Sequence, residues 1–319
     1  MSRPKIYIDG QEGTTGLQIH DRLGEREDIQ LLFIDPDRRK DTAERKKLLN
    51  EADLVFLCLP DSAAAEAVDL IENGHTRVID CSTAHRTAPG WVYGFPELSK
   101  IHRERIVEAK RVANPGCHAT GFISVAYPLV AMNLLPMDAA LSCFSLTGYS
   151  GGGKKMIAQY EGEKGEALYS PALYGLLQNH KHLPEMKVRT GLSSNPVFVP
   201  IVDDYYKGMA TTVPLHMSQL QGVSTLHEVW EKLRDFYAGQ AVVRVAPDPA
   251  DEDEYIDAGS KIYANAMSGK DSLVLIFAGN DRQFTITSLF DNLGKGASGA
   301  AVQNMNLMLG FEETKGLNL

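Results

Sequence analysis

The first hundred residues alternate between short, almost wholly apolar runs and longer amphipathic stretches. An apolar run bounded by polar residues is typical of a strand buried on both faces, and the amphipathic stretches have the spacing of helices that cover a sheet. The alternation predicts a parallel, doubly wound α/β sheet of the Rossmann type. The predicted strands are Lys5–Asp9, Ile29–Ile34, Leu54–Leu59 and Val78–Asp80, and the predicted helices begin at Thr14 or span Thr42–Asn50 and Ala63–Asn73.

The pattern changes in the second third of the chain, where longer strands are separated by helices and irregular loops. We expect an α+β domain here, ending in an antiparallel hairpin around Asn280-Asp281-Arg282. An apolar helix over Ala297–Leu309 is expected to return to the first domain. The predicted domains are residues 1–116 completed by 295–319, and residues 117–294; the longer strands are Ala140–Leu146, Met209–Leu215, Leu273–Gly279 and Gln283–Ser288.

Composition narrows the class of protein. The chain has 319 residues, of which 44% are hydrophobic, enough for two sizeable cores. The formal charge of -9 comes without a basic block, so no nucleic-acid partner is expected. No apolar run reaches membrane-spanning length and the N-terminus leads almost directly into a strand, so we expect no membrane partner and a cytoplasmic location.

The four cysteines have wide and unequal spacing, which fits neither a disulfide framework nor a zinc site. A reducing compartment is the simpler interpretation. Cys58 and Cys143 lie in apolar runs and are interpreted as core residues. The residues around Cys81 assign it no clear role, and Cys117 follows a Pro-Gly pair.

Glycine recurs at every third position between the first strand and the first helix, as Gly10, Gly13 and Gly16. Such a loop lets backbone amides, including those of Thr14 and Thr15, approach a pyrophosphate at the helix N-terminus. The alternative is a tight turn that needs positive φ. The preceding strand and following helix favour dinucleotide binding.

Two features near the end of the second predicted strand disagree about the nucleotide. Asp35 lies where an acidic residue holds a ribose diol, which favours NAD. Arg38, followed by Arg39 and Lys40, offers a guanidinium for a 2′-phosphate, which favours NADP, although a solvated basic surface is equally consistent. These residues alone leave the choice open.

One cysteine lies between a Pro-Gly pair and a long apolar run with helical spacing, in Asn114–Thr120. A helix that begins at Cys117 directs its first amides and the positive end of its dipole at the thiol. Both favour the thiolate, and the same amides would stabilise an oxyanion on a bound carbonyl. The alternative is a small apolar residue that fills the helix start.

The densest group of histidines is His180-Lys181-His182, followed by Leu183-Pro184-Glu185. Histidine is the natural proton-transfer partner of a thiolate near neutral pH. In an extended segment His180 and His182 point the same way, so that one faces the site and the other supports it. No third metal ligand follows nearby, so no metal is expected.

Taken together, seven segments resemble the N-acetyl-gamma-glutamyl-phosphate reductase family in its shorter form, within the aspartate-semialdehyde dehydrogenase-like group. The resemblance runs nearly from end to end. It is carried by Gly10–Gly16, Asp80–Arg86, Tyr93–Leu98, Asn114–Cys117, Ser150–Lys155, His180–Glu185 and Asp291–Ala297.

This resemblance implies NADPH-dependent reduction of N-acetyl-L-glutamyl 5-phosphate, a small acyl phosphate, to the 5-semialdehyde and phosphate in arginine biosynthesis. It implies Cys117 as the nucleophile and His180 as the acid and base. Arg86 matches the substrate loop, Gly152 the glycine run at the cofactor, and Asn292 the border of the nicotinamide site. It also implies NADP as the cofactor, and a homo-oligomer, a dimer or tetramer.

The sequence departs from the commoner family pattern in two places. His118-Ala119 stands where an aromatic-proline pair is expected, and Thr83-Ala84-His85 replaces an acidic-aromatic pair. A reductase of aspartyl or aminoadipyl phosphate would share the cysteine, the histidine and the loop. A nucleotide-binding sensor and a cofactor-free cysteine hydrolase are the alternatives from other classes. The paired nucleophile and base argue against the sensor, and the complete nucleotide loop argues against the hydrolase.

Overall fold

The computed structural model describes residues 3–257 and 259–319. The chain divides into two compact units. The first consists of the described part of Met1–Pro115 together with Ala297–Leu317, and the second of Gly116–Gly296 together with Asn318–Leu319. The chain therefore leaves the first unit, builds nearly all of the second and then returns.

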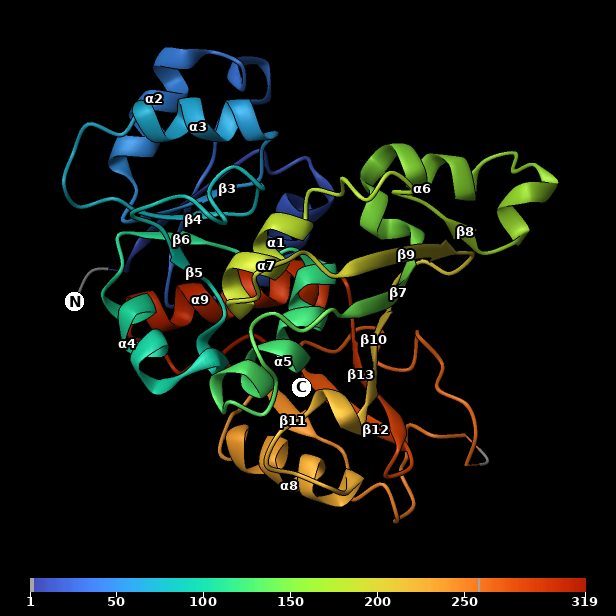
Figure 1. Cartoon of the computed structure of the whole chain (residues 1–319). Coiled ribbons are helices and arrows are strands. Elements are labelled where there is room, and N and C mark those ends of the chain that lie inside the picture. Colours follow the sequence, from blue (N-terminus) through green and yellow to red (C-terminus); the bar gives the residue numbers. More distant parts are fainter. Residues whose placement is uncertain (1–2, 258) are drawn as a thin grey trace. The chain divides into compact units, whose positions relative to one another are not determined.

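The first unit contains a six-stranded sheet in the order β2-β1-β3-β4-β6-β5, and every neighbouring pair is parallel (Figure 1). This confirms the predicted doubly wound sheet. The second strand is shorter than expected and ends at Leu32, because the chain turns into a short 3-10 helix at Pro36. The strands are β1 Lys5–Asp9, β2 Gln30–Leu32, β3 Leu54–Leu57, β4 Arg77–Asp80, β5 Val92–Tyr93 and β6 Arg111–Ala113.

Successive side chains of β1 enter different apolar layers, as the alternation of a strand requires. Ile6 and Ile8 pack with Ile19 of α1 and Met305 of α9, whereas Tyr7 packs on the other face. Helix α9 thus belongs to the core of the first unit, as the sequence predicts. The helices are α1 Thr14–Gly24, α2 Thr42–Glu51, α3 Asp61–Asp69, α4 Lys100–Glu108 and α9 Gly299–Leu309, with short 3-10 helices η1 Pro36–Arg38 and η2 Pro96–Leu98.

The second unit contains a mixed seven-stranded sheet in the order β11-β12-β13-β10-β7-β9-β8. Strands β12 and β13 pair antiparallel across Asn280-Asp281-Arg282, which confirms the predicted hairpin. The strands are β7 Ser142–Gly148, β8 Ala172–Leu173, β9 Val197–Asp203, β10 Met209–His216, β11 Val243–Val245, β12 Leu273–Gly279 and β13 Gln283–Phe290.

Helix α5 crosses this sheet and begins at Cys117, the predicted residue. It packs against β10, β13, α7 and α8, and its second to tenth residues are all buried. A Cβ at Gly121 would lie 2.3 Å from Oγ1 of Thr211, so this glycine permits the close approach of helix and strand. The helices are α5 Cys117–Ala131, α6 Gly153–Glu161, α7 Leu183–Thr190 and α8 Leu226–Phe236, with 3-10 helices η3 Tyr149–Gly152, η4 Glu166–Tyr169 and η5 Met217–Gln219 and a π-helical turn, η6 Gly294–Ser298.

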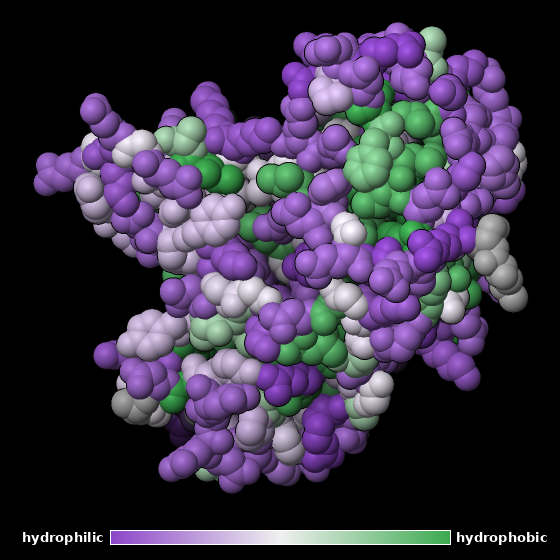
Figure 2. Space-filling model, turned by 180° about the vertical axis from the view of Figure 1, so that it is seen from behind, coloured by the Kyte–Doolittle hydropathy of each residue, from purple (hydrophilic) through white to green (hydrophobic). Residues whose placement is uncertain are grey.

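Hydrophilic side chains predominate on the face drawn in Figure 2, and hydrophobic ones gather there in patches. Such a surface is ordinary for a globular protein. Among the residues that the structure describes, no helix combines the length and the apolar character needed to cross a bilayer.

Candidate functional site

The glycine-rich turn after β1 forms a cradle of backbone groups. Gly10 has a φ of +87°, and a Cβ at this position would lie 2.4 Å from the carbonyl oxygen of Cys58. A Cβ at Gly16 would lie 2.5 Å from the carbonyl oxygen of Gly10. Neither position accommodates a side chain, so the turn and helix α1 pack with the closeness that phosphate binding by backbone amides requires.

The first turn of α1 has no side-chain cap. Its N-cap is Gly13, and the turn contains no acidic residue. Thr14 and Thr15 are half-buried at the first two helical positions. Uncapped amides at the positive end of a helix fit the phosphates of a dinucleotide.

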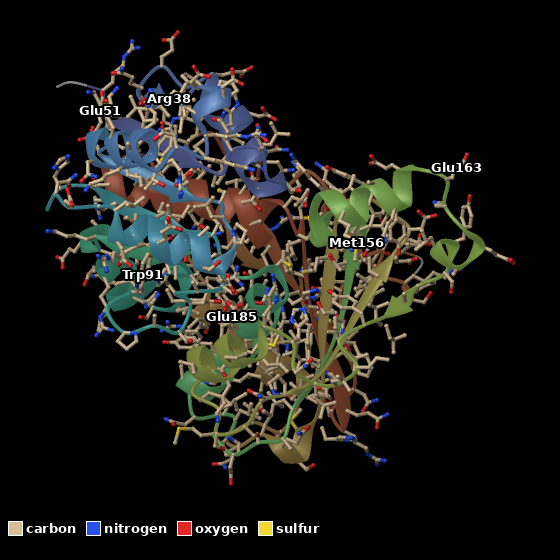
Figure 3. All side chains as sticks on the ribbon, turned by 90° about the horizontal axis from the view of Figure 1, so that it is seen from above. Arg38, Glu51, Trp91, Met156, Glu163 and Glu185 are labelled. Carbon is tan, nitrogen blue, oxygen red and sulfur yellow. The ribbon has the colours of Figure 1, made fainter. Side chains whose placement is uncertain are left out.

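The charged segment after β2 is held by its own contacts. Asp35 caps η1 and accepts a hydrogen bond of 2.9 Å from the backbone N–H of Asp37. The half-exposed Arg38 forms ion pairs with Asp41 at 2.9 Å and Glu44 at 2.7 Å, which raise the pKa of its guanidinium (Figure 3). The basic side chain therefore lies among carboxylates at the surface of the first unit.

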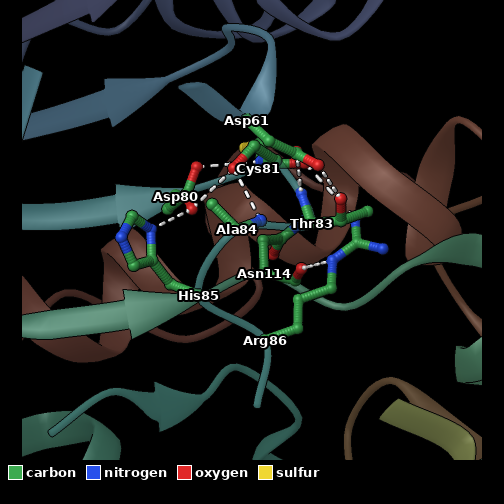
Figure 4. Close-up of polar contacts among 9 residues, drawn as sticks. Asp61, Asp80, Cys81, Thr83, Ala84, His85, Arg86 and Asn114 are labelled. Carbon is green, nitrogen blue, oxygen red and sulfur yellow. Dashed lines mark hydrogen bonds and ion pairs between the residues drawn. The ribbon is translucent and has the colours of Figure 1, made fainter. Parts of the chain in front are cut away.

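Asp80 organises the segment that follows β4. Its buried carboxylate accepts hydrogen bonds from N–H and Oγ–H of Ser82, at 2.9 and 2.8 Å, and lies 2.6 Å from Nδ1 of His85 (Figure 4). The His85 ring stacks on Trp91 with 4.0 Å between ring centroids. These contacts fix the loop that precedes Arg86.

Arg86 is almost completely buried and is oriented by backbone carbonyls. Its Nε donates to the carbonyl oxygen of Asn114 at 3.0 Å, and its Nη2 donates to that of Cys81 at 3.3 Å (Figure 4). Two backbone carbonyl oxygens thus fix the orientation of this guanidinium. The geometry suits the recognition of an anionic group, the task expected of Arg86.

Cys117 is the first residue of α5 and is half-buried. Its N-cap, Gly116, has no side chain to cap the helix, and the first turn contains no acidic residue. The N–H of Gly116 donates to Oε2 of the buried Glu185 at 3.2 Å. A Cβ at Gly296 would lie 3.0 Å from Cβ of Cys117, so a glycine at that position makes room for the thiol.

The other thiols differ from Cys117 in their surroundings. Complete burial in β7 raises the pKa of the Cys143 thiol. Contact with Cys81, and burial after it, raise the pKa of Cys58 well above its usual value. Both residues lie among apolar side chains, as the sequence predicts, and both stay protonated near neutral pH.

The histidine segment is a turn, so the condition of an extended segment, under which His180 and His182 would point the same way, is not met. The N–H of Leu183 donates to the carbonyl oxygen of His180 at 3.0 Å, since the chain is entering α7. The rings of His180 and His182 are nevertheless neighbours, with 4.7 Å between centroids. His182 is buried, and its Nε2 lies 3.9 Å from Oε1 of Glu185, which is also on α7 (Figure 3).

The tautomer of His180 follows from its backbone contact. Its Nδ1 accepts a hydrogen bond of 3.2 Å from the N–H of His182. The proton of a neutral His180 ring is therefore on Nε2, which makes this nitrogen a donor.

His118 is a third histidine of this cluster and is completely buried. Its ring lies 5.7 Å from that of His180 and 5.5 Å from that of His182. Nδ1 lies 2.7 Å from Oγ of Ser145, and Nε2 lies 2.6 Å from the hydroxyl oxygen of Tyr174. Burial, and the charges of His180 and Lys181 after it, lower the pKa of His118 to about 3, so the ring is neutral at pH 7.

Asn292 and the glycine run lie together in the second unit. The buried amide of Asn292 accepts from the N–H of Gly208 at 2.8 Å and donates to Oγ of Ser150 at 3.0 Å. A Cβ at Gly151 would lie 3.5 Å from its Nδ2. Gly152 is exposed and is the N-cap of α6.

Each unit holds a different part of the predicted site. The first carries the glycine cradle, Arg38 and Arg86, and the second brings Cys117 and the histidines together. Sequence reasoning missed the contacts of Ser145 and Tyr174, which come from other elements and have no local signal. Within residues 3–257 and 259–319, no group of three or more His, Cys, Asp or Glu side chains is arranged to hold a metal ion.

Two family models match the chain. The semialdehyde dehydrogenase NAD binding domain matches residues 11–109, and the semialdehyde dehydrogenase dimerisation domain matches residues 117–292. Among solved structures, aspartate semialdehyde dehydrogenase II of Vibrio cholerae, complexed with ASA, has a TM-score of 0.72 at 14% identity, with 97% of this chain and 99% of that one covered. The aspartate semialdehyde dehydrogenase of Candida albicans, solved with NADP, has a TM-score of 0.65 at 15% identity, with 97% and 99% covered. These likenesses show the fold.

Relatives of known sequence are much more similar. An N-acetyl-gamma-glutamyl-phosphate reductase of Brucella anthropi is 48% identical over 315 residues, which cover 97% of this chain and 99% of the relative. N-acetyl-gamma-glutamyl-phosphate reductase 2 of Nostoc sp. is 45% identical over 326 residues, which cover 99% of this chain and all of the relative. With this identity over nearly the whole of both chains, the protein belongs to the N-acetyl-gamma-glutamyl-phosphate reductase family.

Proposed function

We propose that this chain catalyses the NADPH-dependent reduction of N-acetyl-L-glutamyl 5-phosphate to N-acetyl-L-glutamate 5-semialdehyde and phosphate, a step of arginine biosynthesis. The observation that carries the proposal is the position of Cys117 at the uncapped start of α5, directly before His118, whose ring lies 5.7 Å from that of His180 and 5.5 Å from that of His182. A nucleophilic thiolate needs both a stabilised charge and a proton-transfer partner, and this position offers both.

In the proposed reaction Sγ of Cys117 attacks the carbonyl carbon of the acyl phosphate. The C–O bond to phosphate breaks, phosphate leaves with the bonding electrons, and a thioester remains on Cys117. The chemistry that bound NADPH supplies is a hydride for this carbonyl carbon. The resulting oxyanion collapses, expels the thiolate and releases the aldehyde. His180 is the proposed acid and base, which takes the proton of the Cys117 thiol before the attack and returns a proton once the thiolate is released.

The glycine cradle supports the proposed cofactor. Side chains at Gly10 and Gly16 would collide with backbone atoms, and α1 begins without a cap, so the turn fits the phosphates of NADP. We propose Gly10, Gly13, Thr14, Thr15 and Gly16 as the phosphate-binding residues.

We propose three further contacts. Arg38 is the proposed partner of the 2′-phosphate, which would replace one of the carboxylates now paired with its guanidinium. Gly152 and Asn292 are proposed for the nicotinamide end of the cofactor, since the amide of Asn292 is fixed between the backbone N–H of Gly208 and the hydroxyl of Ser150. Arg86 is proposed to bind the phosphate or carboxylate of the substrate.

The two units then have separate tasks in this proposal. Residues 1–116, completed by 295–319, bind NADP, and residues 117–294 carry the thiol chemistry and the contacts between subunits. We propose the cytoplasm as the location of the protein and a homo-oligomer, a dimer or tetramer, as its form. Apolar side chains that remain exposed around three strands of the second unit support this oligomer. They are Phe144, Leu173, Leu176, Leu177 and Val197.

The test is an assay in the reverse direction, with N-acetylglutamate 5-semialdehyde, phosphate and NADP. We expect phosphate-dependent formation of NADPH, followed by absorbance, and much slower formation with aspartate semialdehyde. Replacement of the buried Cys143 by alanine is the matched control, since it removes a thiol outside the site and should leave the turnover per folded molecule unchanged. Absence of a phosphate-dependent signal from folded protein would contradict the proposal.

A further inference from the structure

A chain of four hydrogen-bonding side chains runs through the second unit beside Cys117. Oγ1 of Thr211 lies 2.8 Å from Oγ of Ser145, which lies 2.7 Å from Nδ1 of His118. Nε2 of His118 lies 2.6 Å from the hydroxyl oxygen of Tyr174. Thr211, Ser145 and His118 are completely or almost completely buried, so their polar atoms depend on one another for hydrogen bonds.

The hydrogen bonds of these four side chains can run in two directions, because the neutral His118 ring donates from one nitrogen and accepts at the other. In one direction Tyr174 donates to His118, His118 to Ser145, and Ser145 to Thr211. The buried hydroxyl proton of Thr211 then has no acceptor among the hydrogen bonds of the described residues. A buried donor without an acceptor costs about 1–3 kcal/mol.

The opposite direction moves the proton without an acceptor from the completely buried Thr211 to the half-buried Tyr174. Thr211 donates to Ser145, Ser145 donates to Nδ1 of His118, and Nε2–H of His118 donates to the oxygen of Tyr174. The hydroxyl proton of Tyr174 is then available for a further acceptor. The completely buried groups therefore favour a hydrogen-bond chain that ends in a phenolic donor at Tyr174.

The position of Tyr174 relates this donor to the nucleophile. His118, its hydrogen-bond partner, directly follows Cys117 in the first turn of α5. The ring of Tyr174 lies 5.9 Å from that of His180. Burial, and the negative charge of Cys117 after it, raise the pKa of the Tyr174 hydroxyl, so the phenol stays protonated.

We propose that Tyr174 is a further catalytic residue, whose hydroxyl donates a hydrogen bond to the carbonyl oxygen of the acyl group. This oxygen becomes negatively charged when the sulfur of Cys117 adds to the carbonyl carbon. His118 and Ser145 are positioning residues that set the direction of this donor. The inference rests on the proposed thiol chemistry and adds to it a side-chain donor beside the backbone amides of α5.

The test uses two reagents that both consume the Cys117 thiolate. A nitrophenyl ester acylates the sulfur through an oxyanion and releases nitrophenolate, whereas iodoacetamide alkylates it without one. Tyr174→Phe removes only the hydroxyl. We expect acylation to slow by about 10²-fold, as for the loss of one oxyanion donor, while alkylation stays within about twofold of the unaltered protein.

Ser145→Ala tests the direction of the chain from two bonds away. Without the donor at Nδ1, the His118 ring is free to take the other tautomer, and we expect acylation to slow by about tenfold. The double variant Ser145→Ala/Tyr174→Phe should be no slower than Tyr174→Phe alone, since both changes remove the same donor. Tyr237→Phe is the matched control, because its buried hydroxyl donates to the carbonyl oxygen of Ser124 and lies outside the chain.

Three results would overturn the inference. The Tyr174→Phe variant could be acylated as fast as the unaltered protein, or its acylation and alkylation could slow equally. The third result is a double variant in which the losses of the two single variants add. None of these readouts uses NADPH or an acyl phosphate. Absence of reductase activity would therefore contradict the proposed function alone, and normal acylation by Tyr174→Phe would contradict this inference alone.

Discussion

Two kinds of helix start occur in this protein. Helix α2 begins after Asp41, whose carboxylate accepts from two backbone amides, and α8 begins after Thr225 in a complete capping box with Glu228. Helices α1 and α5 begin after Gly13 and Gly116, without a side-chain cap and without an acidic residue in the first turn.

The contrast shows where local stability is exchanged for binding capacity. A side-chain cap stabilises a helix by about 1 kcal/mol because it satisfies amides that would otherwise lack a partner. The same amides, left uncapped, attract an anion. Helix α5 compensates by burial of nearly its whole length, and α1 by the burial of Ile19 and Leu23. The uncapped starts of α1 and α5 coincide with the proposed cofactor and thiol sites, and α3 and α9 also begin without a side-chain cap.

The largest effect should come from the residue at the start of α5. Cys117→Ser replaces the thiolate by an alcohol that the helix dipole cannot ionise near neutral pH, and we expect kcat to fall by at least about 10³-fold. The rate of NADP reduction by purified, folded variant is the measurement. Retention of a tenth or more of the activity would remove Cys117 from its role.

A cap introduced into α1 should separate stability from binding. A Cβ at Gly13 has only ordinary contacts, 3.5 Å from the Gly10 carbonyl oxygen, so Gly13→Asp fits the fold. Its carboxylate would bind the first amides and repel the phosphates, and we expect KM for NADPH to rise by more than about tenfold, with no loss of unfolding free energy.

Gly24→Asp is the matched control for this change. It adds the same charge to the last turn of the same helix, where a Cβ meets nothing within 4 Å. KM for NADPH should stay within about twofold, since the field of a helix end acts within one turn. An equal rise in KM for both variants would show that charge alone, and not the cap, weakens binding.

The start of α5 should also make the protein sensitive to acid. His118 has a folded pKa of about 3, below the value of about 6.5 expected in the unfolded chain. The unfolded state therefore binds more protons between these values, and the contribution of His118 to stability, complete above pH 6.5, is lost as the pH falls toward 3.

We expect the unfolding free energy to fall by about 2 kcal/mol more between pH 7 and pH 5 than in His118→Gln, whose amide does not titrate. Urea unfolding at the two pH values measures this difference. Parallel pH profiles for the two proteins would exclude His118 as the source of acid sensitivity.

The smallest effect should come from a capped start. Thr225→Ala removes the hydroxyl that accepts from the N–H of Glu228 at 3.2 Å, and we expect a loss of about 1 kcal/mol of unfolding free energy with unchanged kcat and KM. Thr225→Ser keeps the cap and should retain most of the stability. A change in kcat for Thr225→Ala would break the separation between the two kinds of helix start.

Local signals in the sequence were sufficient for much of the fold. Strand β12 has the predicted bounds, and α1 and α5 begin at the predicted residues, because glycine and proline mark these starts. The conformation of the segment after Asn179 was not predictable, since alternating histidines have the same pattern in a turn and in a strand.

The candidate site was predictable where its residues are neighbours in sequence. The glycine cradle and Cys117 belong to short segments with recognisable punctuation. Ser145 and Tyr174 reach His118 only because β7 and the segment after β8 join the same sheet, and nothing in the sequence encodes that pairing locally. Contacts between distant segments depend on the sheet order, which periodicity does not give.

The return of α9 to the first unit also sets an order in time. The ribosome adds about 5–20 residues per second, so it needs roughly 10–40 seconds to make residues 116–296. At the start of this interval the N-terminal part of the first unit has been synthesised, but α9 has not. During that interval the apolar layer that later receives Val302 and Met305 lacks its last helix. The first unit therefore begins first but receives α9 only after residues 116–296 of the second unit have been made.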